Sequence, residues 1–308
     1  MTAKKPNPHR QCRCVRAGEP DYPPEFALLK RPPTEIFICG KLPPPPRVAL
    51  IGSRRTDGYG LEMAGRLAAA LAREGVTIVN GGAAGVDTRA LEAALTEGAP
   101  VVAVLGTGCD RSYPATNRRL FDRVAERGAL LSELPPGSDS LPAYFSARNR
   151  LVSALCDAVV VVRAAEKSGT MVTARYAVEQ GKRLMAVPGP AGAELSLGCH
   201  RLLRAGALMV DSAEDILKAI GRGPAERSLQ LFETDPEREL EAKELQIWRE
   251  LGREAVSVDQ LAQRCRMDSA AVSALLLQLE LKGWVERRPG MVYLACSPRP
   301  AGVSGGKG

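Results

Sequence analysis

Glycine, serine and arginine follow one another at the end of an apolar run, RVALIG at 47–52. Gly52 is followed directly by Ser53, Arg54 and Arg55. Glycine permits a tight turn into a helix, and the first backbone amides of such a helix attract anions. Two guanidinium groups in the same turn add forked donors that suit a phosphodiester better than a neutral ligand. These residues predict an anion site; the alternative is a plain turn with two solvated arginines.

Polar segments also follow several later apolar runs. NGGAAGVD at 80–87 allows close backbone approach to a ligand, and three later loops carry arginines, aromatics and small polar residues. Ligands bind outside the carboxyl ends of parallel strands, so these loops are expected to converge at one sheet edge. The alternatives are that Tyr113-Pro114 is only a turn and that Arg148 and Arg150 form scaffold ion pairs. The candidate contact residues are Gly52, Ser53, Arg54, Arg55, Arg111, Tyr113, Asn117, Arg118, Arg119, Phe145, Arg148, Asn149, Arg150, Lys167, Ser168, Gly169 and Thr170.

Apolar runs rich in valine, isoleucine and leucine alternate with segments of helical periodicity after Arg47. Short, continuous apolar runs are typical of a parallel sheet that is covered by helices on both faces. The alternation predicts an α/β fold, a Rossmann-like doubly wound parallel sheet. Expected strands lie at 47–53, 77–82, 100–108, 129–134, 158–164, 183–189 and 207–210, and expected helices at 57–74, 85–98, 117–128, 145–156, 168–181, 199–206 and 212–220.

Composition divides the chain into five segments. Residues 1–45 are rich in proline and predict an extended N-terminal arm, followed by the Rossmann-like domain at 46–221. Residues 222–237 lack periodicity and predict a linker. Residues 238–296 combine a helix, a helix-turn-helix pattern and the strand–turn–strand sequence VERRPGMVYLA, which predict a small winged-helix domain. Residues 297–308 are poor in apolar side chains and are expected to be disordered.

The net charge of +7 favours acidic partners, but no segment is basic enough to bind polyanions indiscriminately. Residues 238–296 carry nine basic and nine acidic side chains. The candidate recognition helix has no basic residue before Lys282, so strong duplex binding is not expected. The domain is interpreted as a protein-contact or weak accessory module, with Arg287 and Arg288 as its expected phosphate contacts.

The sequence predicts no cofactor and no membrane span. The longest apolar runs, such as AVVVV at 158–162, are far shorter than the roughly 20 residues of a membrane helix, which favours the cytoplasm. The eight cysteines lack zinc-ribbon spacing and are expected to be reduced. His9, Cys12 and Cys14 could touch a metal, but no fourth ligand is evident.

Catalytic signatures are also missing from the sequence. It shows no phosphate-loop lysine and no recognisable set of nucleophile, histidine and carboxylate. His200 is interpreted as a capping or packing residue. Four carboxylates could coordinate a metal if clustered, but helix capping and loop hydrogen bonds explain them more simply. These are Asp87, Asp110, Glu133 and Asp157.

The ordered motifs GSR, GGAAGVD, GTG…YP..N, SELPPG, F.ARNR and SGT..TA..A...G resemble the DNA-processing protein A (DprA, or Smf) family over about residues 20–296. The resemblance implies a non-enzymatic protein that binds and protects single-stranded DNA and loads the RecA recombinase during natural transformation. Members often carry a lysine after the YP pair. Ala115 stands there, so that contact is lost or taken over by Arg118 or Arg119. By this resemblance, the family's strand-one DNA pocket corresponds to Gly52, Ser53 and Arg54. Its other motifs correspond to Asn117, Arg148, Asn149, Arg150, Ser168, Gly169 and Thr170.

The same resemblance implies a homodimer and a RecA contact at the end of the Rossmann-like domain. In the segment DILKAI, Ile216, Leu217 and Ile220 are expected to be exposed for this purpose. The alternative is ordinary core packing of a last helix.

Single-stranded DNA is expected to be held through its phosphates by helix N-termini and by Arg54, Arg55, Arg118 and Arg150. Its bases are expected to lie over the loop with Tyr113 and over Phe145, with little sequence preference because every base offers a face for stacking.

A competing class is a nucleotide-binding, phosphoribohydrolase-like enzyme of the related Rossmann fold. Thr173 and Ala174 stand where its carboxylate is expected, which leaves no route for proton transfer. A third class, a duplex-binding regulator acting through the winged helix, is disfavoured by the neutral charge of that domain.

Overall fold

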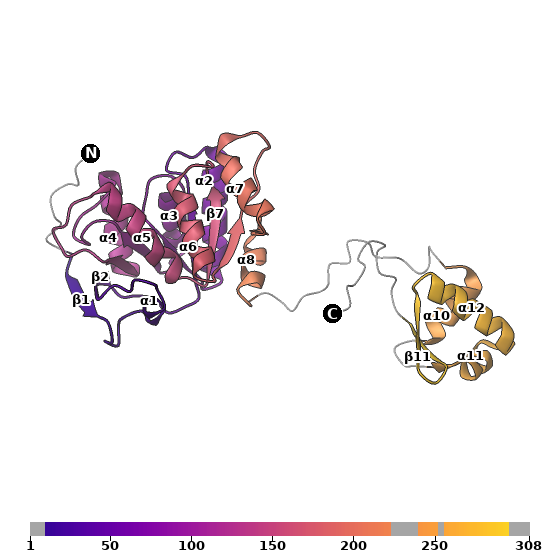
Figure 1. Ribbon diagram of the computed structural model, residues 1–308. Coiled ribbons are helices and arrows are strands. Elements are labelled where there is room, and N and C mark those ends of the chain that lie inside the picture. Colours follow the sequence, from indigo (N-terminus) through magenta and orange to yellow (C-terminus); the bar gives the residue numbers. More distant parts are fainter. Residues whose placement is uncertain (1–9, 223–239, 252–255, 296–308) are drawn as a thin grey trace. The chain divides into compact units, whose positions relative to one another are not determined.

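The computed structural model describes residues 10–222, 240–251 and 256–295 (Figure 1). These residues form two compact units that divide between 225 and 226. Two apolar clusters fill the first unit and a third fills the second. Each unit therefore has a core of its own and is described by itself.

A nine-stranded sheet forms the centre of the first unit, in the spatial order β1-β2-β6-β5-β4-β3-β7-β8-β9. Every neighbouring pair from β6 to β9 is parallel. Strand order runs outward in both directions from β3 and β7, so the winding reverses between these two neighbours, the position where such folds bind ligands. The parallel strands are β3 (Arg47–Gly52), β4 (Thr77–Asn80), β5 (Val101–Leu105), β6 (Ala129–Ser132), β7 (Ala158–Arg163), β8 (Arg183–Ala186) and β9 (Leu208–Met209).

The predicted N-terminal arm is the main correction to the fold. β1 (Cys12–Arg16) pairs antiparallel with β2 (Glu35–Gly40), which pairs antiparallel with β6. Between them, α1 (Pro24–Ala27) buries Phe26 in the core. The interpretation of 1–45 as an extended arm is therefore wrong for the described residues from 10 onward, because the apolar run in β2 pairs with the sheet edge. Residues 1–9 lie outside the described residues.

Helices cover both faces of the sheet (Figure 1). The apolar sides of α2, α3, α4 and α8 pack on one face, and those of α1, α5, α6 and α7 pack on the other. The bounds are α2 (Gly58–Arg73), α3 (Val86–Thr96), the 3-10 helix η1 (Ala115–Asn117), α4 (Arg118–Arg127), α5 (Pro142–Ala154), α6 (Gly169–Glu179), α7 (Glu194–Arg204) and α8 (Ala213–Ala219).

Local sequence explains where α2 begins and ends. The Asp57 carboxylate accepts a hydrogen bond from the amide of Gly60 at 2.9 Å, which satisfies a free donor of the first turn. Met63, Leu67 and Leu71 recur at helical spacing and are buried. The helix ends before Gly75, whose φ of +72° is unfavourable for other residues.

The second unit has the winged-helix arrangement. Three helices pack on a three-stranded sheet of order β10-β12-β11. Trp284 is 2% exposed and stacks edge-on against Trp248, with ring centroids 5.7 Å apart. The elements are α10 (Ala242–Leu251), β10 (Val256–Ser257), α11 (Val258–Cys265), α12 (Ser269–Leu281), β11 (Val285–Arg288) and β12 (Val292–Ala295).

The predicted fold class, a Rossmann-like doubly wound sheet with a winged helix, is confirmed. The exact domain boundaries and the cytoplasmic location stay predictions. Linker residues 223–237 and the tail 297–308 lie outside the described residues. Within the described ranges, none of the helices has the length and apolar character needed to cross a membrane.

Candidate functional site

A cavity of about 890 Å³ opens at the carboxyl ends of the strands on both sides of the switch between β3 and β7. Segments that are far apart in sequence line it, because the parallel strands bring their carboxyl ends to one edge. Its lining residues are Ile51, Gly52, Ser53, Arg54, Arg55, Gly81, Ala83, Asp87, Tyr113, Ser140, Pro142, Phe145, Ser146, Arg148, Asn149, Val152, Ser168, Gly169, Thr170 and Thr173.

The turn after β3 is held rigidly against its neighbours. The Ser53 amide donates to the carbonyl oxygen of Arg163 at 2.8 Å, and the Ser53 carbonyl accepts from the amide of Val86 at 3.3 Å. Gly85 adopts a φ of +81°, and a Cβ there would lie 2.4 Å from the Ser53 carbonyl oxygen. Glycine is therefore required for α3 to begin so close to the turn that carries Arg54 and Arg55.

An arginine and two aromatic rings form one wall of the cavity. The Arg54 guanidinium carbon lies 5.6 Å from the centroid of the Phe145 ring. The Phe145 ring lies 5.0 Å from that of Tyr113, tilted by 43°. Exposed Arg54 and the half-buried rings thus offer a cation for a phosphate next to flat apolar faces for a base.

Two buried charges, Arg148 and Asp87, lie beneath this wall. Arg148 is 6% exposed and donates to the carbonyl oxygens of Gly81, at 2.8 Å, and Val104. Asp87 accepts from the amides of Gly81, at 3.1 Å, and Ala83, at 3.3 Å. Burial raises the pKa of Asp87 to about 6, although Arg148 and the backbone amides oppose the shift. Burial also lowers the pKa of Arg148 to about 10, although Asp87 opposes that shift. Arg148 thus supports the cavity floor from within.

The N-terminus of α6 also lines the cavity. Ser168 is its N-cap residue, but its side chain makes no capping hydrogen bond. Among the described residues, Ser168 Oγ and Arg148 Nε are buried polar atoms without a hydrogen-bond partner. The first amides of α6 therefore remain available for an anion in the cavity, whereas Ser168 Oγ and Arg148 Nε are buried from solvent.

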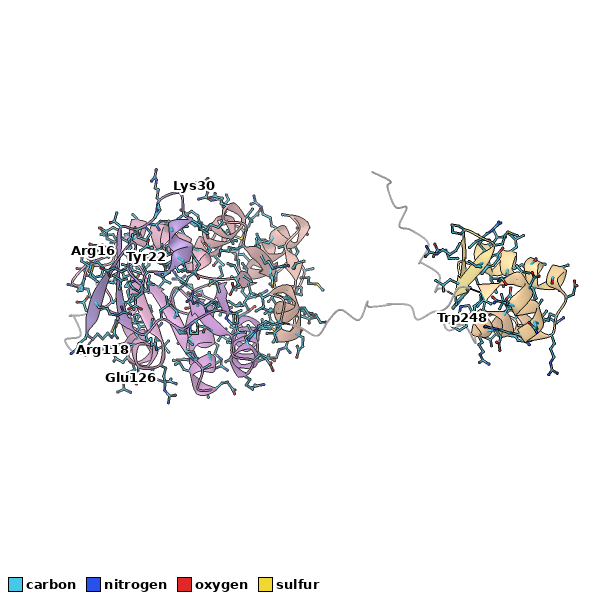
Figure 2. All side chains as sticks on the ribbon, turned by 90° about the horizontal axis from the view of Figure 1, so that it is seen from below. Arg16, Tyr22, Lys30, Arg118, Glu126 and Trp248 are labelled. Atoms are coloured by element: carbon cyan, nitrogen blue, oxygen red, sulfur yellow. The ribbon has the colours of Figure 1, made fainter. Side chains whose placement is uncertain are left out.

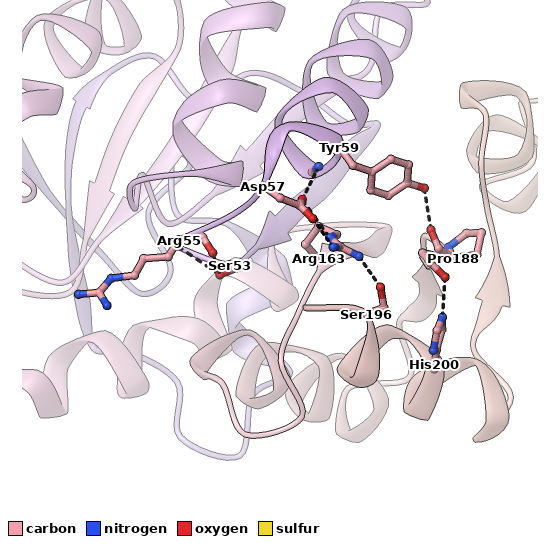
Figure 3. A network of polar contacts seen from close by, with 10 residues as sticks. Ser53, Arg55, Asp57, Tyr59, Arg163, Pro188, Ser196 and His200 are labelled. Carbon is pink, nitrogen blue, oxygen red and sulfur yellow. Dashed lines mark hydrogen bonds and ion pairs between the residues drawn. The ribbon is translucent and has the colours of Figure 1, made fainter. Parts of the chain in front are cut away.

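A polar network behind the cavity fixes the loop between β3 and α2 (Figure 3). The guanidinium of Arg163, 2% exposed, contacts the Asp57 carboxylate and Ser196 Oγ. Tyr59 donates to the carbonyl of Pro188 at 2.7 Å, and His200 Nε2 lies 3.0 Å from the carbonyl oxygen of Gly189. His200 therefore packs as expected. Arg163 and Asp57 were not predicted from the sequence, since an arginine that ends a valine-rich strand gives no sign of a buried ion pair.

The structure brings eleven of the predicted contact residues together in the cavity and leaves six outside its lining. Three of those six already hold partners. Arg150 donates to both Glu133 oxygens at 2.6 Å, Arg111 pairs with Asp139 at 2.7 Å, and Asn117 donates to the Gly82 carbonyl at 3.0 Å. Their assignment as DNA contacts stays a prediction, and the scaffold alternative fits their geometry better. The remaining three, which are exposed, are Arg118, Arg119 and Lys167.

The predicted exposure of the last helix is wrong. Ile216 is 0% and Leu217 9% exposed, and both belong to the core, against which Ile220 also packs. The alternative of core packing therefore holds. Exposed apolar residues lie just before α8 instead, at Leu208 and Met209 on edge strand β9.

The cavity also has lining residues that the sequence did not single out. Ser140 and Pro142 lie between the motifs SELPPG and F.ARNR, whereas Ser146 and Thr173 lie inside predicted motifs but were not named as contacts. The described part of the chain contains no group of three histidine, cysteine, aspartate or glutamate residues that could hold a metal ion. His9 lies outside the described residues.

Asp87 predicts a specific pH dependence of stability. Its raised pKa means that the folded state binds a proton more tightly than the unfolded state between about pH 4 and 6. The free energy of unfolding should therefore fall by up to about 3 kcal/mol as pH rises through this window. Asp87→Asn should remove that slope, measured by urea unfolding from about pH 4 to 7.5. If the free energies of unfolding of wild type and Asp87→Asn changed with pH in the same way, the pH dependence could not be assigned to Asp87.

Together these observations define a class: a Rossmann-like protein with an anion-binding cavity at its topological switch point, joined to a winged-helix domain. The family model of DNA recombination-mediator protein A matches residues 13–221, and that of the DprA winged helix domain matches residues 233–291. The chain belongs to the DprA/Smf family.

Relatives and solved structures agree with this assignment. Protein Smf of Escherichia coli is 36% identical over 299 residues, which cover 93% of this chain and 77% of that protein. The crystal structure of DprA from Streptococcus pneumoniae is 34% identical with a TM-score of 0.64, covering 69% of this chain and 75% of that one. A structure of DprA from Helicobacter pylori, described for its single-stranded DNA binding mode, is 33% identical with a TM-score of 0.63, covering 70% and 97%.

Proposed function

We propose that this chain binds single-stranded DNA in the cavity at the switch point. The observation that carries the proposal is the wall formed by Arg54, Phe145 and Tyr113 in the same cavity as the uncapped N-terminus of α6. A cation and free amides suit a phosphate, and flat rings suit an unpaired base. The relative from Helicobacter pylori, which binds single-stranded DNA, supports the same conclusion.

The winged helix supports a preference for single strands. Lys282, the first basic residue after α12 begins, pairs with buried Glu244 at 2.7 Å. Leu277 and Leu281 on α12 are 57% and 81% exposed. A duplex-reading helix presents cations or amides to the groove, so this surface is suited to another partner.

We further propose that the protein is not an enzyme. Thr173 and Ala174 occupy the positions where a hydrolase's carboxylate is expected, and both are buried. Asp87 is the acidic residue among those that line the cavity, and it accepts two backbone amides there. These bonds hold the carboxylate in place as part of the cavity wall.

A titration of a fluorescent poly-dT oligonucleotide and a matched duplex across salt tests the proposal. We expect tighter binding of the single strand, with log affinity falling against log salt at a slope of about −3.5 for about five phosphate contacts. A flat salt response, or equal affinity for the duplex, would contradict it and direct attention to nucleotide hydrolysis.

The family resemblance extends the proposal to protection of incoming DNA, loading of RecA during natural transformation, and a homodimer. The apolar pair Leu208 and Met209 on edge strand β9, 47% and 62% exposed, supports a dimer surface. Light scattering should show a dimer for the wild type and a monomer for Leu208→Glu/Met209→Glu. If the wild type were only monomeric at high concentration, the homodimer proposal would be contradicted. The proposed loading of RecA is tested by measuring how RecA assembles on protein-covered single-stranded DNA in the presence and in the absence of this chain.

A further inference from the structure

We propose that α4 carries a second DNA contact surface, an arginine track formed by Arg119, Arg123 and Arg127, which receives phosphates of the strand beyond the cavity. The inference rests on the proposed function. The three residues recur every four positions, so they lie on one side of the helix about 6 Å apart along its axis. All three are exposed, whereas Leu120, Phe121 and Val124 bury the opposite side.

The cations of the track have no intramolecular partner among the described residues. No ion pair or side-chain hydrogen bond joins Arg119, Arg123 or Arg127 to the described part of the chain. Asp122, which lies beside them on α4, pairs instead with Arg10 at 2.8 Å. Exposed Glu126 is the other acidic residue of the helix. The outer side of α4 therefore carries an excess of positive charge. Arg118 and Glu126 of this helix are labelled in Figure 2.

This placement is unfavourable for an isolated helix. Like charges four residues apart repel each other, and cations near a helix N-terminus oppose the helix dipole. Arg118 and Arg119 begin α4, and Arg119, Arg123 and Arg127 form two successive like-charged pairs. A polyanion that neutralises the track would remove both penalties. Arginine is also suited to phosphates because its planar fork donates two hydrogen bonds at once.

The track is continuous with the cavity through one ordered segment. Tyr113 lines the cavity and is followed by Pro114, η1 and then α4. Asn117 ties η1 to Thr88 Oγ1 at 2.7 Å. The buried guanidinium of Arg10 donates to the carbonyl of Arg118 and to Ser112 Oγ, both at 3.1 Å. A strand that leaves the cavity past Tyr113 therefore meets the start of a firmly held α4. This continuity, with the regular spacing of the cations, favours nucleic acid over an acidic protein surface as the occupant.

The length of the oligonucleotide separates the track from the cavity. Binding of dT oligomers of about 6 and about 20 nucleotides is measured for the full chain and for Arg119→Ala/Arg123→Ala/Arg127→Ala. The control, Arg31→Ala/Arg183→Ala/Arg204→Ala, removes the same charge from exposed positions elsewhere on the first unit that do not line the cavity. We expect the track variant to bind the short oligomer within about twofold of wild type. It should lose roughly 10- to 100-fold in affinity for the long one, and its salt slope should become shallower by about 2.

Two outcomes would contradict the proposal that the arginine track binds DNA beyond the cavity. Equal affinity of the track and control variants for the long oligomer would assign the arginines to another anion, such as an acidic protein. Equal losses for both oligomer lengths would mean that α4 acts only through the cavity. Failure of the wild type to bind either oligomer is the separate result that would remove the proposed function itself. Thermal unfolding of each variant, expected to match wild type because the sites are exposed, excludes misfolding as the cause.

Discussion

Replacing Arg54 and Arg55 together by alanine should weaken binding of single-stranded DNA by at least about 100-fold, the largest loss expected from exposed residues in the cavity. Each substitution removes a charge-assisted hydrogen bond of about 1.5–3 kcal/mol, and Arg54→Ala also removes the cation over Phe145. The salt slope should become shallower by about 1.4 because two phosphate contacts are lost. Fluorescence titration of a poly-dT oligonucleotide across salt measures both quantities.

The Arg54→Ala/Arg55→Ala variant should keep its fold, because both substitutions lie in the cavity lining. Arg54 and Arg55 are both exposed, so the free energy of unfolding of the double variant should stay within about 0.5 kcal/mol of wild type. Phe145→Leu provides a complementary variant, since it removes the aromatic face and retains both arginines. It should weaken DNA binding without changing the salt slope. A double variant that binds poly-dT like wild type would place the DNA elsewhere on the protein.

The sequence predicted the core of the fold because a buried parallel sheet has a simple signature. Strands such as AVVVVR at 158–163 are apolar throughout, as expected when helices cover both faces. The turn at Gly52–Arg55 could be placed at the sheet edge because a parallel strand must end there. The antiparallel strands β1 and β2 were missed, since prolines on both sides of the run EIFICG concealed a strand that pairs with β1 and with β6.

Most of the remaining differences between the predicted and the observed site concern the partners of individual side chains. A sequence shows that Arg150 and Asn117 are polar, but not that Glu133 and Gly82 lie within hydrogen-bond distance of them. The exposure of Ile216 and Leu217 could not be judged either, because a short helix at the end of a domain can pack inward or outward. Such contacts join residues distant in the chain, and only the folded structure brings them together.

The C-terminal unit adds a related lesson. Its helix-turn-helix pattern was recognisable from sequence, and the lack of basic residues before Lys282 already argued against strong duplex binding. In the structure, Arg288 also pairs with Glu286 at 3.0 Å and Lys282 pairs with Glu244. Lys282 and Arg288 are therefore partly neutralised, and the exposed leucines of α12 favour the interpretation as a protein-contact module.

Arg163→Met should destabilise the first unit by about 3 kcal/mol, because breaking a buried ion pair leaves its partners unsatisfied. The value lies at the low end of the usual range because the Asp57 side chain is 43% exposed and can be rehydrated. Ser196 Oγ would also lose its donor, and Tyr59 would lose the cation 5.3 Å from its ring centroid. Urea unfolding measures the loss, and poly-dT affinity should fall with it because Asp57 ends the loop that carries Arg54.

The pH dependence of stability distinguishes this ion pair from simple loss of packing. Burial alone would raise the pKa of Asp57, but hydrogen bonds from Arg163 and the Gly60 amide outweigh it and lower the pKa. A lowered pKa contributes stability above the ordinary carboxyl range, and this contribution is lost as pH falls through the folded-state value. The difference in unfolding free energy between wild type and Arg163→Met should therefore shrink below about pH 4. Asp57→Asn, which retains a capping side chain, should show the same loss of acid sensitivity. A constant difference from acid to neutral pH would mean that Arg163 acts only by filling space.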